Sequence, residues 1–312
     1  FEAARFPGGV EVHTGSIRAT MTLDGPEHGS LRFFPLAPGV ILSFNRIYTQ
    51  VWPLAQTEAA NILLLNFCLN GRCEVDLDNG QFAFLSQGIM ALGPQQVREA
   101  YRYPSGIYEG VELFLDLDAL EQEPYCLFLE IGIDLSALIR HFQAAQKLYL
   151  AQAPAAIQGI LSELWALRDT EDIGRMKLNS ARLLLELGRQ PYVPHPRIRY
   201  FTRSQVTIAK EVRSILLSDL SQNHTARALA ERFQIGETSL KNYFRGVFGE
   251  NLSVWLREAR MRQAAELLRD TDLRVADIAE QVGYENQSKF AAVFVKEYSC
   301  PPLEYRRRAR LD

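Results

Sequence analysis

Two runs of polar residues near the end of the chain have the types and spacing that nucleic-acid recognition requires. In the major groove of DNA, asparagine can pair with adenine and lysine with guanine. The runs are Glu237, Thr238, Lys241 and Asn242, and then Asn286, Gln287, Ser288 and Lys289. The first run faces outward on a helix if Leu240 and Phe244 face inward. Both runs therefore predict base contacts, with ordinary solvated helix surfaces as the alternative.

Basic residues beside these runs suit the DNA backbone, because phosphate contacts position a protein without specifying sequence. The candidates are Arg245, Lys296, Arg306 and Arg307. Arg260 lies between the runs, where an internal salt bridge and a DNA contact both remain open. Residues 197–312 hold 20 Lys/Arg and 15 Asp/Glu, a net charge of +5, whereas the rest of the chain carries −8. This asymmetry favours a polyanionic partner for the basic segment, with chance scatter as the alternative.

The two runs lie in segments that repeat at an offset of 49 to 50 residues. The copies are TARALAERFQIGETSLKNYFRGVFG (225–249) and VADIAEQVGYENQSKFAAVFVKEYS (275–299). Their apolar positions correspond, Leu229 to Ile278, Phe233 to Val282, Leu240 to Phe290 and Phe244 to Phe294. Each copy predicts a short helix, a tight turn and a second helix. This is the helix-turn-helix, whose second helix can enter the major groove.

The stretch DIAEQVGYENQSKFAAVFVKEYSCPPLEYRR (277–307) resembles the arabinose-regulator (AraC/XylS) family of bacterial transcription factors. Its matching positions are Asp277, Ile278, Ala279, Gly283, Tyr284, Lys289, Phe290, Phe294, Pro302, Tyr305 and Arg306. The resemblance covers roughly residues 205–308 and implies two helix-turn-helix units joined by a long helix at 254–268. More loosely, it implies a cupin-like effector-binding barrel in the N-terminal half. RNA polymerase is a further candidate partner of such a regulator.

The chain departs from the family pattern at several positions. Ser299 replaces the usual Gly, Pro301 replaces the usual Ser or Thr, and Gly236 stands where a Ser usually caps the first reading helix. Ala291 and Ala292 occupy positions of the second reading helix that are often polar or basic. The second unit is therefore expected to contact bases weakly and to grip phosphates.

Residues 31–116 read as antiparallel strands. Asn70-Gly71 and Asn79-Gly80 each separate alternating runs and predict two-residue hairpins. These turns would pair Cys68 with Cys73 and Val75 with Phe84. One buried face would then carry Ile62, Leu64, Asn66, Cys68, Cys73, Val75, Leu77, Phe82 and Phe84. The two cysteines would be close enough for a disulfide, with two buried thiols as the favoured alternative.

The strand region is the expected site of a small, partly apolar organic effector. Asn66 is the exceptional residue on the presumed inner face, because a buried amide must find a partner. A ligand or a neighbouring strand could supply that partner. The candidate effector-binding residues are Asn66, Arg46, Tyr48, Trp52, Phe82, Phe84 and Glu112.

Helical periodicity begins near residue 134. An apolar stripe predicts a homodimer interface, with a cover for the strands as the alternative. Its residues are Ile157, Leu161, Leu164, Leu167, Met176, Leu183 and Leu187. The proline-rich stretch RQPYVPHPRIRYFTR (189–203) predicts a linker. We therefore expect four parts: a barrel (1–133), a dimerisation segment (134–188), a linker (189–204) and a DNA-binding domain (205–312).

Catalysis and metal binding find little support in the sequence. The five histidines form neither an H-x-H nor an H-x-x-x-H pair, and the four cysteines form no C-x-x-C pair. No P-loop, dinucleotide fingerprint or nucleophile elbow is present. Apolar runs are far too short to span a bilayer, and the first residues lack a secretion signal. We expect a cytoplasmic protein without cofactor, metal or membrane contact.

These patterns together predict an α+β protein with a cupin-like antiparallel barrel, a helical dimerisation segment and an all-α tandem helix-turn-helix domain. The predicted function is sequence-specific binding of double-stranded DNA to regulate transcription, controlled by a small organic effector. The alternative is the same architecture controlled by a protein partner, or by no ligand.

Overall fold

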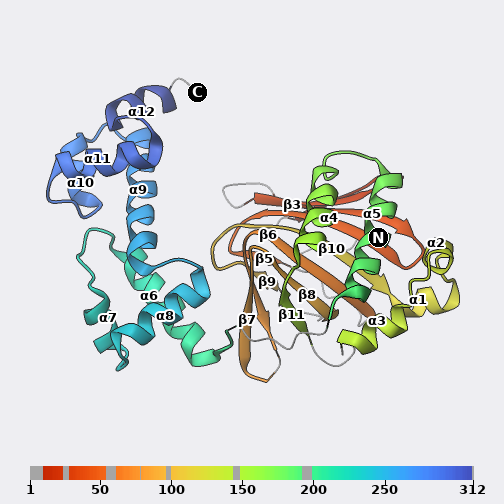
Figure 1. Cartoon of the computed structure of the whole chain (residues 1–312). Coiled ribbons are helices and arrows are strands. Elements are labelled where there is room, and N and C mark those ends of the chain that lie inside the picture. The colour runs from red at the N-terminus through yellow and green to blue at the C-terminus, as the bar shows by residue number, and fades with distance from the viewer. Residues whose placement is uncertain are drawn as a thin grey trace. The chain divides into compact units, whose positions relative to one another are not determined.

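The computed structural model describes residues 10–23, 28–53, 61–77, 79–95, 100–142, 148–191 and 199–310. The chain divides into two compact units, Phe1–Tyr200 and Phe201–Asp312 (Figure 1). The predicted helical segment at 134–188 lies in the same unit as the strands. Most of the predicted linker falls between helices that end at Arg189 and begin at Arg203, and its residues 192–198 lie outside the described residues.

The first unit is built on antiparallel strands. They are β1 (Val10–Thr14), β2 (Ala19–Leu23), β3 (His28–Ala37), β4 (Val40–Tyr48), β5 (Val51–Pro53), β6 (Ile62–Asp76), β7 (Gln81–Ser86), β8 (Ile89–Pro94), β9 (Ala100–Arg102), β10 (Tyr108–Asp116) and β11 (Tyr149–Gln152). The order is β1-β2-β3-β4-β10-β6, after which β6 pairs with β8 and β7 along its two halves and β8 pairs with β11. Pairings within this described part form no closed ring. The antiparallel sheet is confirmed, but the closed barrel is not seen.

Asn70-Gly71 is not a hairpin, contrary to the sequence prediction. Strand β6 runs straight through it, and the pairing of β6 with β10 shifts register there. Gly71 has a φ of +81°, and a Cβ on it would lie 1.9 Å from the carbonyl oxygen of Ile107. A bulge needs one residue with positive φ, whereas the predicted turn needs two, so the glycine serves a bulge against β10.

The second Asn-Gly pair does lie in a hairpin, but the register differs by one residue from the prediction. The Leu77 amide donates to the carbonyl of Gln81, which leaves a three-residue loop ending at Gly80 with a φ of +77°. Val75 therefore opposes Ala83 instead of Phe84. A slip of one residue moves side chains to the other face of the sheet. Phe82 and Phe84 consequently do not share a face with Val75.

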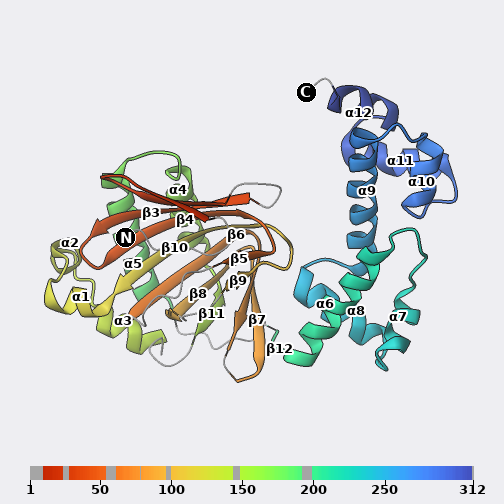
Figure 2. The ribbon, with the colours of Figure 1, turned by 180° about the vertical axis from the view of Figure 1, so that it is seen from behind.

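Five helices follow the strands, and the last two cross one face of the sheet (Figures 1 and 2). They are α1 (Leu117–Gln122), α2 (Cys126–Glu130), α3 (Leu135–Phe142), α4 (Ala155–Ala166) and α5 (Ile173–Arg189). All seven residues of the predicted dimer stripe are buried here in one core with Phe34, Phe44 and Phe67 of the sheet. The dimer prediction for this stripe is therefore wrong, because a surface already buried within the chain cannot also face a second subunit.

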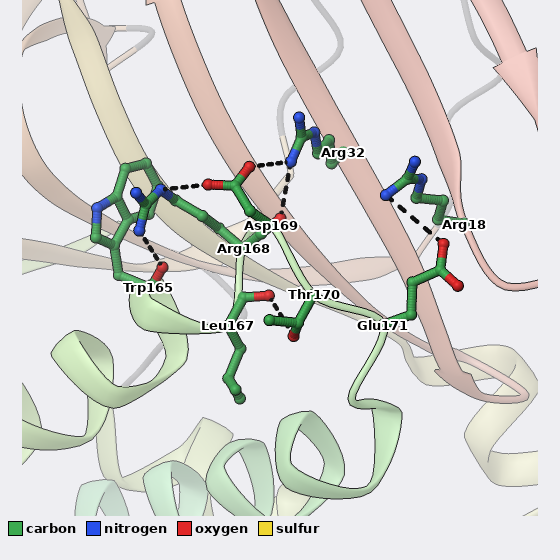
Figure 3. A network of polar contacts seen from close by, with 8 residues as sticks. All are labelled: Arg18, Arg32, Trp165, Leu167, Arg168, Asp169, Thr170 and Glu171. Carbon is green, nitrogen blue, oxygen red and sulfur yellow. Dashed lines mark hydrogen bonds and ion pairs between the residues drawn. The ribbon is translucent and has the colours of Figure 1, made fainter.

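Polar contacts hold the turn between α4 and α5 against strands β2 and β3 (Figure 3). Arg32 of β3 donates to the carbonyl of Arg168 at 3.0 Å and forms an ion pair with Asp169. Arg18 pairs with Glu171 at 3.7 Å. The guanidinium of Arg168 lies 5.0 Å from the ring centre of Trp165. The helical layer is thus fixed at its apolar face and at its connecting turn.

The second unit is helical. After the short strand β12 (Phe201–Thr202) come α6 (Arg203–Ser218), α7 (Ala226–Arg232), α8 (Glu237–Phe248), α9 (Leu252–Asp270), α10 (Val275–Gln281), α11 (Gln287–Tyr298) and α12 (Pro302–Ala309). Thr202 and Gln205 form a complete capping box at the start of α6, which sets the first residue of the domain's first helix. Helices α7 and α8, and then α10 and α11, are the two predicted helix-turn-helix units. The central helix α9 joins them (Figure 2).

Each unit is held by its own aromatic core on α9. Phe244 of α8 packs edge-on against Trp255 near the start of α9, with ring centres 5.6 Å apart. Phe290 and Phe294 of α11 are fully buried with Met261 further along α9. Within the described residues, no helix is both long and apolar enough to cross a membrane.

Candidate nucleic-acid interface and sheet pocket

Helix α8 presents a polar face to solvent because its apolar residues are buried in the core. Leu240 and Phe244 are completely buried. All five predicted contact residues on α8 are exposed: Glu237, Thr238, Lys241, Asn242 and Arg245. Gly236 precedes the helix as its N-cap and provides no side-chain hydrogen bond. The start of α8 therefore leaves backbone amides available, and such amides favour anions.

Lys241 is already engaged within α8. Its ammonium forms an ion pair with Glu237 one turn earlier, and both side chains are largely exposed. Exposed pairs at this spacing stabilise by only about 0.3–0.5 kcal/mol. A base or phosphate can therefore replace Glu237 as the partner of Lys241 at little cost.

Helix α11 presents a second exposed face. Gln287, Ser288, Lys289 and Lys296 are exposed, while Phe290 and Phe294 are buried. Asn286 caps the helix, and its Oδ1 accepts a hydrogen bond from the Lys289 amide at 3.0 Å. Its amide oxygen therefore holds the helix start, and only its NH₂ group remains to address a base. Ala292 is exposed on the same helix.

The two arginines predicted to bind phosphate on α12 differ in their surroundings. Arg307 is exposed. Arg306 is half-buried, and it donates to the carbonyls of Leu268 at 3.2 Å and Leu273 at 2.5 Å. These acceptors lie at the end of α9 and in the loop that follows. Arg306 therefore joins α12 to α9, and its donors point into the protein.

The sequence left open whether Arg260 contacts DNA or forms an internal salt bridge. In the structure its contacts are internal, but they are hydrogen bonds to backbone carbonyls and not a salt bridge. Its guanidinium donates to three backbone carbonyls of the second unit: Leu220, Gln222 and Gly283. A sequence pattern shows charges but not carbonyl directions, so this arrangement was not predictable.

In the first unit, Asn66 lines a pocket on the side of the sheet away from α4 and α5. The other lining residues are Leu64, Cys73, Glu74, Val75, Leu85, Ala91, Gly93, Pro94, Tyr101 and Leu148. The pocket has about 60 Å³ of space for the centres of water molecules, where one water needs about 10–15 Å³. The pocket is lined mainly by apolar side chains and has room for a small group or for part of a larger molecule.

A polar cluster made of Ser43, Asn45, Asn66, Tyr108 and Glu112 adjoins this pocket. The Asn66 Nδ2 donates to Glu112 Oε1 at 2.7 Å, and the Tyr108 hydroxyl donates to Asn66 Oδ1. The Ser43 hydroxyl donates to Asn45 Oδ1 at 2.7 Å. Burial raises the pKa of Glu112 to about 7, against the opposing effect of a hydrogen bond with Asn45. The partners of Asn66 are thus Tyr108 and Glu112 of the neighbouring strand β10, which is one of the two alternatives that the sequence left open.

The predicted effector residues do not all meet. Asn66 and Glu112 are hydrogen-bonded, and Trp52 is buried in the core on their side of the sheet. Arg46 and Tyr48 alternate with Asn45 and therefore lie on the opposite side of β4. There the Tyr48 hydroxyl donates to Glu109 at 2.8 Å. Phe82 and Phe84 are buried but face away from Cys73 and Leu85, as the register of β7 requires.

Sequence reasoning missed Tyr108, Ser43 and Asn45. Their faces depend on the pairing of β4 with β10, and no turn residue fixes that register. The predicted opposition of Cys68 and Cys73 is also wrong. Cys68 lies across from Gly110 and Cys73 across from Leu85. Both cysteines are buried and neither forms a disulfide, and burial raises the pKa of Cys68 to about 12.

Several known proteins are similar to part of this chain. The "Helix-turn-helix domain" family matches residues 229–308. The transcriptional activator RhaR of Mannheimia succiniciproducens is 31% identical over 105 residues, or 34% of this chain and 38% of that protein. RhaR of Yersinia pseudotuberculosis is 41% identical over 75 residues, or 24% of this chain and 26% of that protein. The chain therefore contains a helix-turn-helix domain that is similar to the DNA-binding domains of AraC-family transcriptional regulators.

A solved structure is also similar to part of this chain. The C-terminal domain of AraT, a response regulator from Geobacillus stearothermophilus, is 32% identical with a TM-score of 0.32. That match covers 32% of this chain and 84% of the AraT chain. The chain spans less than two fifths of the length of the RhaR proteins it matches.

Proposed function

We propose that this protein regulates transcription by binding double-stranded DNA with α8 and α11 in successive major grooves. The observation that carries the proposal is the pair of exposed polar faces, each backed by a buried aromatic core on α9. Helix α9 has 19 residues. It is therefore about 28 Å long, close to the roughly 34 Å of one DNA turn. Residues 197–312 carry a net charge of +5, which suits this part of the chain to a polyanion.

The direct test is selection of DNA fragments by the full chain from a random duplex library, followed by affinity measurements at increasing salt. Neutralised phosphates release counterions, so affinity should fall by about 10³ or more between 50 and 200 mM salt if six or more phosphates are contacted. Lys296→Ala should reduce the salt slope by about 1. Arg175→Ala, an exposed site on α5, serves as the control. A folded chain without salt-sensitive binding would refute the proposal.

The two reading helices should contribute unequally to base preference. Asn242 has a free side chain on α8, whereas α11 carries the exposed Ala292 and uses Asn286 as its cap. A bidentate base contact contributes about 1–3 kcal/mol of discrimination. Asn242→Ala should therefore relax the selected sequence more than Ser288→Ala does. Binding-site selection with both variants measures this, and an equal or reversed loss would contradict the asymmetry.

We further propose that the first unit senses a small organic effector with apolar bulk, bound at the pocket beside Asn66. The support is the composition of the lining: apolar side chains with a few polar groups that can orient a ligand. Control by a protein partner, or constitutive binding, is the alternative.

A thermal-shift screen of apolar metabolites tests this effector proposal. A ligand at a hundred times its Kd stabilises the folded state by about 2.7 kcal/mol. Val75→Phe should abolish the shift by filling the pocket without touching the polar cluster. Asn66→Ala should reduce it, measured against the variant's own melting temperature. Stabilisation by sugar phosphates alone would refute the apolar class, and constitutive DNA affinity without any ligand would favour the alternative.

A further inference from the structure

Arg260 lies where the two helix-turn-helix units meet. Its Nε donates to the Leu220 carbonyl at 2.9 Å and its Nη2 to the Gln222 carbonyl at 2.8 Å. Both acceptors belong to the loop that leads into α7 of the first helix-turn-helix (α7 and α8). Its Nη1 lies 3.4 Å from the carbonyl oxygen of Gly283, in the turn between α10 and α11 of the second helix-turn-helix. One side chain on α9 therefore contacts a loop of each unit.

The packing at this point leaves no room for a side chain on Gly283. A Cβ on Gly283 would lie 2.6 Å from Arg260 Nη2 and 2.8 Å from the Leu220 carbonyl oxygen. The turn of the second helix-turn-helix, at Gly283, thus packs directly against the loop before the first one, at Leu220. The guanidinium also lies 5.9 Å from the ring centre of Tyr284.

The chemistry of arginine explains why this residue type is needed. Its planar group carries five N–H donors in a fixed fork, whereas lysine has a single flexible ammonium. The guanidinium of Arg260 can therefore donate to all three carbonyls at once, those of Leu220, Gln222 and Gly283. Because its donors are directed to backbone carbonyls, Arg260 is poorly disposed to bind a phosphate.

We propose that Arg260 is a positioning residue that fixes the angle between the two units and so sets the half-site spacing that the domain accepts on DNA. This inference rests on the proposed function, because spacing has meaning only if both units bind. Each unit keeps its own core without Arg260: Phe244 packs on Trp255, and Phe294 is buried with Met261. Loss of the arginine should therefore loosen the angle without unfolding either unit.

The experiment uses the full chain and its library-selected DNA. Duplexes are prepared with the spacer between the half-sites changed by −1, 0, +1 and +2 base pairs, together with duplexes that carry only one half-site. Wild type should lose tenfold or more in affinity when the spacer changes by one base pair. Arg260→Met and Arg260→Lys should vary less than threefold across the spacer panel, with an unchanged salt slope.

Lysine is the decisive variant, because it keeps the charge and loses the fork. If Arg260 contacts phosphate, Arg260→Lys will bind like wild type and Arg260→Met will lose about one unit of salt slope, which overturns the proposal. Full spacing discrimination in both variants overturns it as well. Arg257→Met, at an exposed site on the same helix, should leave the spacing profile unchanged.

Two further outcomes separate this inference from the proposed function. Gly283→Ala places a methyl group against Arg260 and the Leu220 carbonyl, so it should disturb the same contact and make binding equally tolerant of spacer length. This variant tests the contact even if an Arg260 variant fails to fold. If wild type binds one-half-site duplexes as well as complete ones, the second unit does not bind DNA and both proposals fail. If wild type needs both half-sites but the variants keep its spacing profile, only the inference fails.

Discussion

Glu112 is an acidic side chain packed against the amides of Asn66 and Asn45. It is partly accessible, but burial raises its pKa to about 7 from an ordinary value of 4.5. Below pH 4.5 the carboxyl is protonated in both the folded and the unfolded chain, so it has no effect on stability. As pH rises from 4.5 to 7, the unfolded chain ionises first, and the free energy of unfolding falls. The full loss is reached above pH 7.

Glu112→Gln should therefore stabilise the protein at pH 8 and much less at pH 5. The glutamine carbonyl can still accept the hydrogen bond from Asn66. We expect a gain at pH 8 of about 1–2 kcal/mol, because solvent reaches part of the side chain and reduces the effect of burial. Urea unfolding at both pH values measures it, with Glu163→Gln on α4 as a surface control. Equal gains at both pH values would show that the effect is not titration.

What the sequence shows about single residues depends on how local the determinant is. The outward position of Lys241 and Asn242 follows from the helical period and the apolar partners on α8, and the structure places both in solvent. Asn66 is visible as a polar exception within an apolar strand. Its partners Tyr108 and Glu112 are 42 and 46 residues away along the chain, and only strand pairing brings them together.

At the scale of elements, the helices of the second unit were predictable and the strand turns only in part. Repeated apolar positions locate α8 and α11 because a helix buries them through contacts three and four residues apart. Asn-Gly pairs are less decisive. The same dipeptide forms a hairpin loop at Asn79-Gly80 and a bulge at Asn70-Gly71, because positive φ at glycine suits both. The neighbour at Gly71 is the carbonyl of Ile107, which local sequence does not indicate.

The ends of the two reading helices differ in a way that stability measurements can detect. Helix α8 ends at Gly249 with a φ of +90°, whereas α11 ends at Ser299 with a φ of +57°. The left-handed conformation costs a residue with a Cβ about 1–2 kcal/mol, and glycine costs about 0.5–1 kcal/mol in chain entropy. Ser299→Gly should therefore raise the free energy of unfolding by about 0.5–1 kcal/mol.

Gly283 provides the contrasting control. It also has positive φ, but Arg260 and the Leu220 carbonyl occupy the space that a Cβ would need. Gly283→Ala should therefore lower stability, by more than the left-handed conformation alone costs. A thermal-unfolding series of the two variants would show opposite signs. A loss of stability in Ser299→Gly would mean that the serine side chain makes a favourable contact at this helix end.

At the scale of the whole molecule, the apolar stripe of α4 and α5 belongs to the interior of the first unit. Leu164 is fully buried. Leu164→Ala should cost about 2–5 kcal/mol, as truncations in a packed core do. Ser162→Ala, at an exposed site on the same helix, should change stability by less than about 0.5 kcal/mol. Urea unfolding gives both numbers.

Light scattering on the same variants checks independently that the stripe lies in the core and not between two chains. If the stripe is core, Leu164→Ala will keep the wild-type mass as long as it remains folded. A folded variant with halved mass and unchanged stability would instead return the stripe to an interface. The sequence could not separate these outcomes, since a helix face that covers a sheet and one that meets a second chain have the same composition.

Helix α9 has a consequence for how the length of this domain can vary. Both reading units pack on one continuous helix, so each inserted residue would rotate the second unit by about 100° and advance it by about 1.5 Å. A rotation of that size would turn α11 away from the major groove that we propose it enters. Insertions and deletions within Leu252–Asp270 should therefore be tolerated far less well than in the stretch between Arg189 and Arg203, which precedes the helices of this domain. Among homologous genes, the number of codons for α9 should stay constant even where its surface residues change freely.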